Sequence, residues 1–391
     1  MAPTTLRWGI VATGWISTKF SLDLLVDPLT RDVKDVQHVI AAVASRSTAK
    51  AGQFVDDVWK EAGVTKGKED VKLYGSYDDI YSAPNVDVLY IGTPHSNHYQ
   101  NVLAALTAGK SVLCEKSLTV NGKQAEALVK LARSKGLFFM EAVWTRFQPV
   151  SYKVQEVLRS GVIGEVRSVQ AELSVNLDAA TRNPSHRMVN PTLAGGALLD
   201  LGPYPWTWLA LLLLPPSGAL QTPIAPLKLS SSILKGPTGV DHSTVAAIQF
   251  PQEDGRIVHG TLTTGLEAQT TPSRVVVVQG SKGFLEIQWA TYRPESFSYS
   301  AWETEAAYGG MESINQAPKT ESFSFGDRPG GIWGFAWEAD EVARCIRDGK
   351  KESDRMPLRE TVLMMQTFDE IRKQGDFVYP EQIESLEKQD L

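Results

Sequence analysis

Glu115 and Lys116 stand directly after an apolar run, VLC, that is typical of a buried strand. A lysine that leaves such a strand is either a surface charge ending the strand or a cation kept near a reacting group, whose pKa it lowers. His95 and His98 lie three residues apart after the preceding apolar run, but no cysteine or acidic cluster accompanies them. Six histidines in all give no better grouping, so we expect no metal site.

A turn that resembles a dinucleotide fingerprint follows the first apolar run of the chain. Ala12-Thr13-Gly14-Trp15-Ile16-Ser17 stands where such a fingerprint has G-x-G-x-x-G, and Gly14 is its middle glycine. A missing side chain there lets a pyrophosphate approach the backbone, and the following helix offers free N–H groups and the positive end of its dipole. A plain strand–turn–helix is the alternative interpretation.

The second apolar run ends at Ser45 and Arg46. An NAD site places Asp or Glu here to accept from the ribose 2′-hydroxyl, and this chain has neither. Arg46 instead offers a guanidinium that can neutralise a 2′-phosphate with forked hydrogen bonds and lie on the adenine. A solvated arginine at a strand end is the alternative. We predict NADP(H) rather than NAD(H) as the cofactor.

Short β-branched runs alternate with segments of helical period from residue 6 to about residue 141, which is typical of parallel βαβ units. The predicted strands are Leu6–Val11, Val39–Ala44, Val71–Tyr74, Val86–Ile91, Ser111–Cys114 and Leu137–Met140. The predicted helices between them include Ala49–Ala62, Asp78–Ser82, Asn97–Ala108 and Lys123–Lys135. This is a doubly wound α/β sheet, and ligands bind beyond the carboxyl ends of its strands.

After Phe147 the pattern becomes that of an α+β domain with a mostly antiparallel sheet, because Gly and Pro separate long strand-like runs at hairpin intervals. The predicted strands are Val166–Val175, Ser230–Lys235, Val245–Phe250, Gly260–Gly265, Arg274–Gln279 and Phe284–Trp289. Helical patterns return at Phe335–Arg347 and Leu358–Lys373. We therefore expect a nucleotide domain over 1–146, a second domain over 147–356, and a helix over 357–375 that packs back onto the first.

Length and composition are ordinary for a globular protein of two domains: 391 residues, 42% apolar and 21% charged. The 39 basic and 45 acidic residues give a net charge of −6, which argues against nucleic acid and anionic membranes as partners. The longest apolar run, Trp206–Leu214, is too short to cross a bilayer. The first residues, MAPTTLRWGIV, lack the pattern of a secretory signal, so we expect none, and Cys114 and Cys345 are the only cysteines. We expect a cytoplasmic protein.

Six segments in this order and spacing resemble one enzyme family: WGIVATGWIS, ASRS, GTPHSNH, CEKSLTVN, EAVWTRF and GGALLDLGPY. The chain is similar to the glucose-fructose oxidoreductase / inositol dehydrogenase / MocA family, in the branch of dimeric dihydrodiol dehydrogenases and NADP-dependent D-xylose 1-dehydrogenases. The resemblance implies a Rossmann domain, an α+β domain with an open sheet face, and a homodimer. The family's E-K-P motif matches Glu115 and Lys116, but Ser117 replaces its proline. The sequence therefore leaves open whether the peptide bond before Ser117 is cis.

The family's second motif, an Asp followed four residues later by His or Tyr, falls on Asp200 and Tyr204. The resemblance implies that Tyr204 takes a proton from the substrate hydroxyl, that Lys116 favours the phenolate, and that Asp200 orients the sugar or Tyr204. Glu115 would hold Lys116 or the cofactor ribose. A packed tyrosine ring is the alternative interpretation of Tyr204.

The other candidate site residues extend these motifs. Trp144, Arg146 and Phe147 either close over the nicotinamide and sugar or form a domain-junction core, and the polar segment 176–186 is either a sugar-binding segment or a surface loop. The predicted cofactor-binding residues are Ala12, Thr13, Gly14, Trp15, Ile16, Ser45, Arg46, Lys50, Thr93, Pro94, Asn97, His98, Glu115, Lys116, Trp144 and Arg146. The predicted substrate-binding residues are Phe147, Asn176, Asp178, Asp200 and Tyr204.

Three functions follow from the resemblance. The first is NADP-dependent oxidation of an aldose at C1, with D-xylose as the favoured sugar. The second uses the same residues to oxidise trans-1,2-dihydrodiols. The third is a non-catalytic NADP-binding regulator, against which the presence of both Lys116 and Tyr204 argues.

Overall fold

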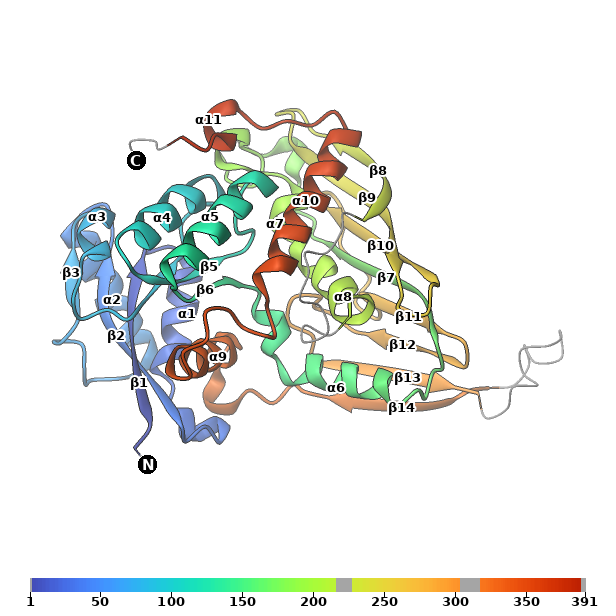
Figure 1. The fold of residues 1–391 in the computed structure, drawn as a ribbon, viewed down its shortest axis with the longest axis horizontal. Helices are drawn as coiled ribbons and strands as arrows, with labels where there is room; N and C mark the ends of the chain where they lie inside the picture. Colours follow the sequence, from blue (N-terminus) through green and yellow to red (C-terminus); the bar gives the residue numbers. More distant parts are fainter. Residues whose placement is uncertain (1, 216–226, 303–316, 388–391) are drawn as a thin grey trace.

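Two β-sheets form the core of the molecule (Figure 1). The computed structural model describes residues 2–215, 227–302 and 317–387. The first sheet has six parallel strands in the order β3-β2-β1-β4-β5-β6. They are β1 (Thr4–Val11), β2 (Val36–Ala44), β3 (Lys72–Tyr74), β4 (Val88–Ile91), β5 (Ser111–Glu115) and β6 (Phe139–Ala142). The order reverses between β1 and β4, which opens the crevice where doubly wound sheets bind ligands.

The helices between these strands begin and end at residues whose chemistry favours helix ends. The side chains of Ser47, Ser76 and Asn121 accept hydrogen bonds from N–H groups in the first turns of α2, α3 and α5. Gly63 and Gly136 end α2 and α5 in the left-handed conformation. The helices are α1 (Trp15–Leu25), α2 (Thr48–Ala62), α3 (Tyr77–Tyr81), α4 (His95–Thr107) and α5 (Gly122–Lys135).

The second sheet has eight strands in the order β14-β13-β12-β11-β7-β10-β9-β8. All pairs are antiparallel except β7 with β10. The strands are β7 (Val166–Ser174), β8 (Lys228–Lys235), β9 (Asp241–Pro251), β10 (Ile257–Gly265), β11 (Val276–Gly280), β12 (Gly283–Ile287), β13 (Ser296–Ala301) and β14 (Lys319–Ser324). The sequence analysis missed β13 and β14. β14 is exposed along most of its length, so no apolar alternation marks it.

Helices cover one face of this second sheet. α8 (Pro203–Leu213) packs on β7 and β10, α7 (Ala197–Leu201) on β9, and α10 (Leu358–Gln374) on β8. Within the described residues no helix covers the opposite face, where Leu234, Val245 and Ile257 are exposed (Figure 1). The sheet therefore has an open side that carries apolar side chains.

The C-terminal helices join the two sheets. α10 packs against α5 as well as β8, so it contacts both domains. α9 (Phe335–Arg347) packs against α1, β1 and β2, although the sequence analysis grouped these residues with the second domain. The remaining helices are α6 (Pro149–Arg159), α11 (Glu381–Glu384) and the 3₁₀ turns Pro28–Arg31, Trp144–Phe147, Ala179–Thr181, Pro191–Leu193 and Pro329–Gly331. Across the described ranges, no helix has the length and apolar character needed to cross a membrane.

Candidate active site

A cavity of about 1350 Å³ lies between the two domains, beyond the carboxyl ends of the first sheet's strands. Pockets for drug-sized ligands are about 300–1,000 Å³, so this one has room for a dinucleotide and a small molecule together. Predicted site residues from both domains line it. They are Ala12, Thr13, Gly14, Trp15, Ile16, Ser45, Arg46, Lys50, Thr93, Pro94, Asn97, Glu115, Lys116, Trp144, Asp200 and Tyr204.

The N-terminus of α1 faces this cavity without a side-chain cap. A Cβ atom built on Gly14 would meet no atom within 4 Å, so packing within the protein does not require glycine there. The open space leaves the first N–H groups of α1 accessible, as a pyrophosphate needs. Ala12, at the first position of the turn, has a φ of +76°, a conformation that glycine adopts more easily.

Arg46 lines the far end of the cavity and is exposed. Beside it, the hydroxyls of Ser45 and Thr13 lie 2.9 Å apart and hold the ends of β1 and β2 together. Arg46 forms no ion pair with any residue that the structure describes, so its guanidinium is available to an anionic ligand. Residues 75–78, which follow β3 and begin α3, complete this end, and the sequence analysis did not include them.

Lys116, Asp200 and Tyr204 meet at the other end of the cavity. The Nζ atom of Lys116 donates to the carbonyl oxygen of Asp200 at 2.6 Å and lies 3.3 Å from its Oδ1 atom. The same ammonium lies 5.0 Å from the centre of the Tyr204 ring. Lys116 follows β5 in the first domain, and the other two belong to α7 and α8 in the second, so the site forms only where the domains meet.

Burial and charge act in opposite directions on this cluster. Burial raises the pKa of Tyr204 to about 12, although the ammonium of Lys116 lowers it. Burial opposes the charge of Lys116, but the negative charge of Asp200, and those of Tyr204 and Glu115 when they are ionised, raise its pKa overall. Burial likewise favours neutral Asp200, but Lys116 and Arg187 hold the pKa of that carboxyl well below its usual range. Lys116 and Asp200 are therefore a charged pair, and Tyr204 is a phenol, at neutral pH.

Glu115 is buried at the end of β5 and lines the cavity. Its Oε1 atom accepts a hydrogen bond from the hydroxyl of Tyr90 at 2.7 Å, and its Oε2 atom accepts one from the backbone N–H of Lys116 at 3.2 Å. Burial raises the pKa of Glu115 to about 7, although Lys116 and Tyr90 oppose the shift.

His95 and Arg187 complete the charged end of the cavity, and the sequence analysis proposed neither as a site residue. The Nη1 atom of Arg187 lies 3.1 Å from Asp200 Oδ1, and His95 Nε2 lies 3.7 Å from the same oxygen. Burial lowers the pKa of His95 to about 3, so its imidazole is neutral. Arg187 directly follows the polar segment 176–186, which was the one sequence signal for it.

Two family profiles match the chain. The profile of an oxidoreductase family with an NAD-binding Rossmann fold, GFO/IDH/MocA, matches residues 6–143, and the profile of the GFO/IDH/MocA C-terminal domain matches residues 152–286. The chain belongs to the GFO/IDH/MocA oxidoreductase family. Both matched regions contribute residues to the cavity described above.

Two relatives within this family have similar sequences over nearly their whole length. The NADP⁺-dependent D-xylose 1-dehydrogenase of Hypocrea jecorina is 42% identical, over 97% of this chain and 95% of its own. The trans-1,2-dihydrobenzene-1,2-diol dehydrogenase of Bos taurus is 35% identical, over 96% and 98%. Among solved structures, a levoglucosan dehydrogenase bound to NADH and levoglucosan has a TM-score of 0.75 at 17% identity, over 95% of this chain and 98% of its own. That similarity concerns the fold.

Several predicted site residues of this GFO/IDH/MocA chain lie outside the cavity. The ring nitrogens of His98 each lie 2.8 Å from a backbone carbonyl oxygen, of Ser117 and of Thr93, so His98 joins the ends of β4 and β5. Arg146 is buried, where its Nη2 atom pairs with Glu360 Oε2 at 2.6 Å. This ion pair corrects the expectation that Arg146 contacts the cofactor, because its partner lies in α10, far away in the sequence.

The remaining substrate-binding predictions also fall elsewhere. Phe147 is buried in the domain-junction core. The side chain of Asn176 accepts a hydrogen bond from the backbone N–H of Asp178, so these two residues form a local turn outside the cavity. Trp144 does line the cavity: its indole N–H donates to the Tyr204 hydroxyl at 3.4 Å, and its ring stacks on Phe335 at 4.2 Å. Trp144 is thus the member of the EAVWTRF segment that reaches the site.

Ser117 connects the lysine loop to the second domain. The peptide between Lys116 and Ser117 is cis, which the serine in place of proline had left open. The hydroxyl of Ser117 donates to the carbonyl oxygen of Leu199 in α7 at 2.7 Å. Within the described ranges, no group of three or more His, Cys, Asp or Glu residues is placed to hold a metal ion.

Proposed function

We propose that this oxidoreductase uses NADP⁺ to oxidise an aldose at C1 to the aldonolactone, with D-xylose as the favoured substrate. The observation that carries the proposal is the Lys116–Asp200–Tyr204 cluster at the end of a dinucleotide-sized cavity. The D-xylose 1-dehydrogenase of Hypocrea jecorina, 42% identical over 97% of this chain, supports the choice of sugar.

The free guanidinium of Arg46 supports NADP⁺ over NAD⁺. It stands at the end of β2, where an NAD site has a carboxylate that accepts from the ribose 2′-hydroxyl. A guanidinium in that place would instead pair with a 2′-phosphate. The uncapped end of α1 would hold the pyrophosphate, and Ser45 and Lys50 lie beside Arg46.

In the proposed reaction, Tyr204 first loses its own proton, and its phenolate then takes the proton of the anomeric hydroxyl while C1 loses a hydride. The bound nicotinamide supplies the hydride acceptor. Lys116 lies 5.0 Å from the Tyr204 ring and stabilises the developing phenolate. The Asp200 carboxylate, fixed by Lys116 and Arg187, orients the sugar hydroxyls. The lactone product hydrolyses without further help from the protein.

Oxidation of trans-1,2-dihydrodiols is the second candidate, because the enzyme of that name from Bos taurus is 35% identical over nearly the whole chain. The two substrates require the same base and the same hydride acceptor. NADPH absorbance followed over pentoses, hexoses and trans-1,2-dihydrobenzene-1,2-diol distinguishes them. We expect the highest kcat/KM with D-xylose. Turnover of the diol alone would select the second candidate, and no turnover with any of them would favour the non-catalytic regulator.

We also propose a cytoplasmic homodimer. The open face of the second sheet exposes Leu234, Val245 and Ile257, and such apolar faces in soluble proteins often mark subunit contacts. Cys114 and Cys345 are both free and buried, which suits a reducing compartment. Sedimentation velocity of the purified protein tests the dimer.

A further inference from the structure

The second domain places a guanidinium at the end of the cavity that holds Lys116, Asp200 and Tyr204. Among the described residues of this domain, Arg187 and Asp200 are the charged ones that line the cavity. The Nη1 atom of Arg187 lies 3.1 Å from Asp200 Oδ1, and the Arg187 side chain is 61% exposed. Its Nε and Nη2 atoms form no hydrogen bond with any residue that the structure describes. Arg187 therefore has donors left for a ligand in the cavity.

The backbone of Arg187 is held against the residues that begin α7, the helix of Asp200. The N–H of Gly196 donates to the carbonyl oxygen of Met188 at 2.8 Å. A Cβ atom built on Gly195 would lie 2.7 Å from the carbonyl oxygen of Arg187, so the two segments are in direct contact. The position of Arg187 relative to Asp200 is thus set before a ligand binds, which lowers the entropy cost of binding.

The charge of Arg187 is only partly offset. Asp200 Oδ1 lies 3.3 Å from Lys116 Nζ and 3.1 Å from Arg187 Nη1, so one carboxylate faces two cations. His95, 3.7 Å from the same oxygen, is neutral. Glu115, the other carboxyl group that lines this end, already accepts hydrogen bonds on both oxygens within the first domain. The guanidinium therefore presents positive charge to the cavity.

The ligand group that best matches these donors is a carboxylate. A guanidinium fork binds both oxygens of a carboxylate, whereas a neutral sugar offers it hydroxyls alone. A hexuronate carries its carboxylate on C5. C1 and C5 both adjoin the ring oxygen of a pyranose, so this carboxylate lies within the width of one ring from C1. Tyr204, which would act at C1, is near enough to Arg187 that its ionised form raises the pKa of Arg187, as Asp200 does more strongly.

We propose that Arg187 binds the C5 carboxylate of a hexuronate, and that the protein oxidises D-glucuronate at C1 as well as a neutral aldose. This rests on the proposed function. D-Glucuronate is D-xylose with a carboxylate in place of one C5 hydrogen, so both sugars present the same hydroxyls. The C1–H bond breaks and its electron pair leaves with the hydrogen as hydride to NADP⁺, while the C1 hydroxyl proton moves to the Tyr204 phenolate. The sugar loses two electrons and two hydrogens and becomes a glucarate lactone, and its carboxylate is unchanged.

Three sugars that differ only at C5 test the proposal with the intact enzyme. D-Xylose carries hydrogen there, D-glucose a neutral hydroxymethyl group and D-glucuronate a carboxylate. Initial rates of NADPH formation give kcat/KM for each sugar. We expect kcat/KM for D-glucuronate to exceed that for D-glucose about tenfold or more, because a charge-assisted hydrogen bond is stronger than a neutral one. Equal values for these two sugars, or a lower value for D-glucuronate, would contradict the carboxylate site.

Arg187→Gln removes the charge and keeps an amide that can donate to Asp200. We expect the ratio of kcat/KM for D-glucuronate to that for D-glucose to fall about tenfold in this variant, and to fall less in Arg187→Lys, which keeps the charge. A disturbance of Asp200 lowers both rates alike and cancels in the ratio. Arg182→Gln, at an exposed arginine that does not line the cavity, is the matched control and should keep the wild-type ratio. An unchanged ratio in Arg187→Gln would overturn the role of Arg187.

Binding without turnover separates the carboxylate site from the proposed function. Calorimetry with the NADPH-bound enzyme compares D-glucuronate with D-glucuronamide, in which a neutral amide replaces the carboxylate. We expect D-glucuronate to bind about tenfold more tightly to the wild type, and both to bind equally to Arg187→Gln. Equal affinities in the wild type would refute the site even if D-xylose is oxidised. The expected difference without turnover of any sugar would support the site and contradict the proposed oxidation.

Discussion

At the residue scale, the protonation states in the site depend on how the Lys116 ammonium interacts with Asp200 and with Tyr204. Lys116 donates to Asp200 at 2.6 and 3.3 Å and lies 5.0 Å from the Tyr204 ring. The Asp200 carboxylate lies nearer to the ammonium than the Tyr204 ring does. It therefore offsets much of the stabilisation that Lys116 would give to a Tyr204 phenolate. Burial therefore outweighs the effect of Lys116 on the pKa of Tyr204, and the phenol must lose its own proton before it can act as a base.

Lys116→Met and Tyr204→Phe should each lower kcat at least a hundredfold, because each removes a step of acid–base catalysis. NADP⁺ should still bind with nearly the wild-type Kd, since Arg46 and the α1 end are untouched. Stopped-flow kinetics and calorimetry measure the two effects separately. Lys123→Met, an exposed lysine on α5, is the control. Wild-type turnover in either active-site variant contradicts the proposed mechanism.

Arg46→Ala should raise KM for NADP⁺ at least tenfold and leave KM for NAD⁺ almost unchanged. The guanidinium has no ion pair within the described residues, so its loss leaves no buried charge unpaired. A charge-assisted hydrogen bond contributes about 1.5–3 kcal/mol, which corresponds to roughly 10- to 150-fold. Initial rates with both cofactors give the ratio, and equal changes for the two would exclude a 2′-phosphate contact.

At the element scale, short segments are held by groups from other elements. α7, which carries Asp200, has no side-chain cap of its own at Gly196. Asp241 from β9 supplies one, because its Oδ2 atom accepts from the N–H of Leu198 at 2.7 Å. A Cβ atom on Gly196 would lie 2.1 Å from Asp241 Oδ1, so glycine is required for this approach. The helix that carries Asp200 is thus positioned by a strand residue that lies 43 positions from Leu198 in the sequence.

The backbone of the turn between β1 and α1 is strained at Ala12, and a substitution there can remove the strain. Ala12 has a φ of +76°, which costs an L-residue about 1 kcal/mol relative to glycine. Ala12→Gly should therefore raise the free energy of unfolding by about 0.5 kcal/mol after the added entropy of the unfolded chain is subtracted. Urea unfolding measures the change. Ala44→Gly, in the buried end of β2, should instead destabilise the protein.

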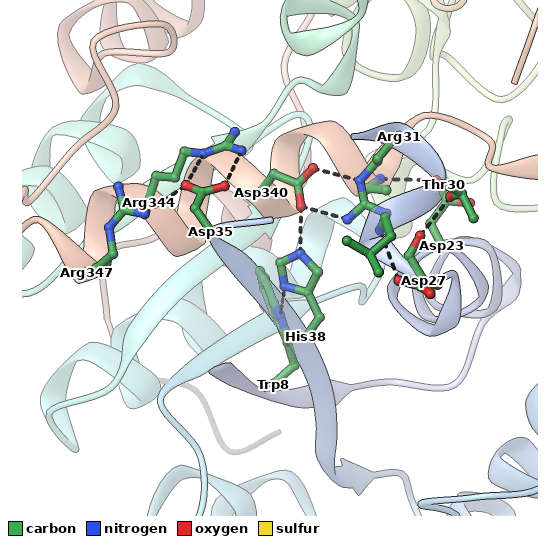
Figure 2. A network of polar contacts seen from close by, with 12 residues as sticks. Trp8, Asp23, Asp27, Thr30, Arg31, Asp35, His38, Asp340, Arg344 and Arg347 are labelled. Carbon is green, nitrogen blue, oxygen red and sulfur yellow. Dashed lines mark hydrogen bonds and ion pairs between the residues drawn. The ribbon is translucent and has the colours of Figure 1, made fainter. Parts of the chain in front are cut away.

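At the scale of the whole molecule, a polar network fixes α9 to the first sheet (Figure 2). The carboxylate of Asp340 on α9 accepts from Arg31 Nε and Nη2, each at 2.7 Å, and from His38 Nε2 at 2.9 Å. Trp8 donates to the other ring nitrogen of His38. Asp35 forms further ion pairs with arginines of α9. Since Phe335 at the start of this helix and Trp333 just before it both line the cavity, the network also sets one wall of the site.

Asp340→Asn should lower the free energy of unfolding by about 3–5 kcal/mol. The side chain of Arg31 is only 1% exposed, and the variant leaves its charge buried without a counter-charge. The midpoint of urea unfolding at pH 7.5 measures the loss. Asp32→Asn, whose ion pair with Lys34 is exposed, should change stability by less than about 0.5 kcal/mol. Similar small effects from both variants would argue against a buried pair.

His38 should make stability fall with acidification. Burial lowers the pKa of His38, and its Nδ1 atom accepts from Trp8, so the folded protein keeps the neutral ring. The unfolded chain binds a proton at His38 below about pH 6.5, which favours unfolding as the pH falls. His38→Gln should therefore take up about one proton fewer on unfolding at pH 5.5 than the wild type does. Unfolding free energies from pH 7.5 to 5.5 test this, and parallel curves would contradict it.

The sequence by itself determined the strands of the first domain and the residues at their ends. Alternation of apolar runs and helical periods predicted the six parallel strands, and position after a strand predicted that Gly14, Arg46, Glu115 and Lys116 would line one cavity. These features depend on residues that are close together in the sequence, so they can be recognised without knowledge of the fold. Tyr204 and Asp200 were predicted only through the resemblance to the family, whose motif places these two residues four positions apart.

Only the tertiary structure decided which charges meet. Arg187 and His95 both approach Asp200, whereas Arg146 faces Glu360, 214 residues away, and not the cavity. Such contacts leave no periodic signal, because they depend on how α4, α7 and α10 pack rather than on local spacing. The same holds for the pKa values: burial between two domains raises those of Glu115 and Tyr204, and burial is a property of the assembled fold.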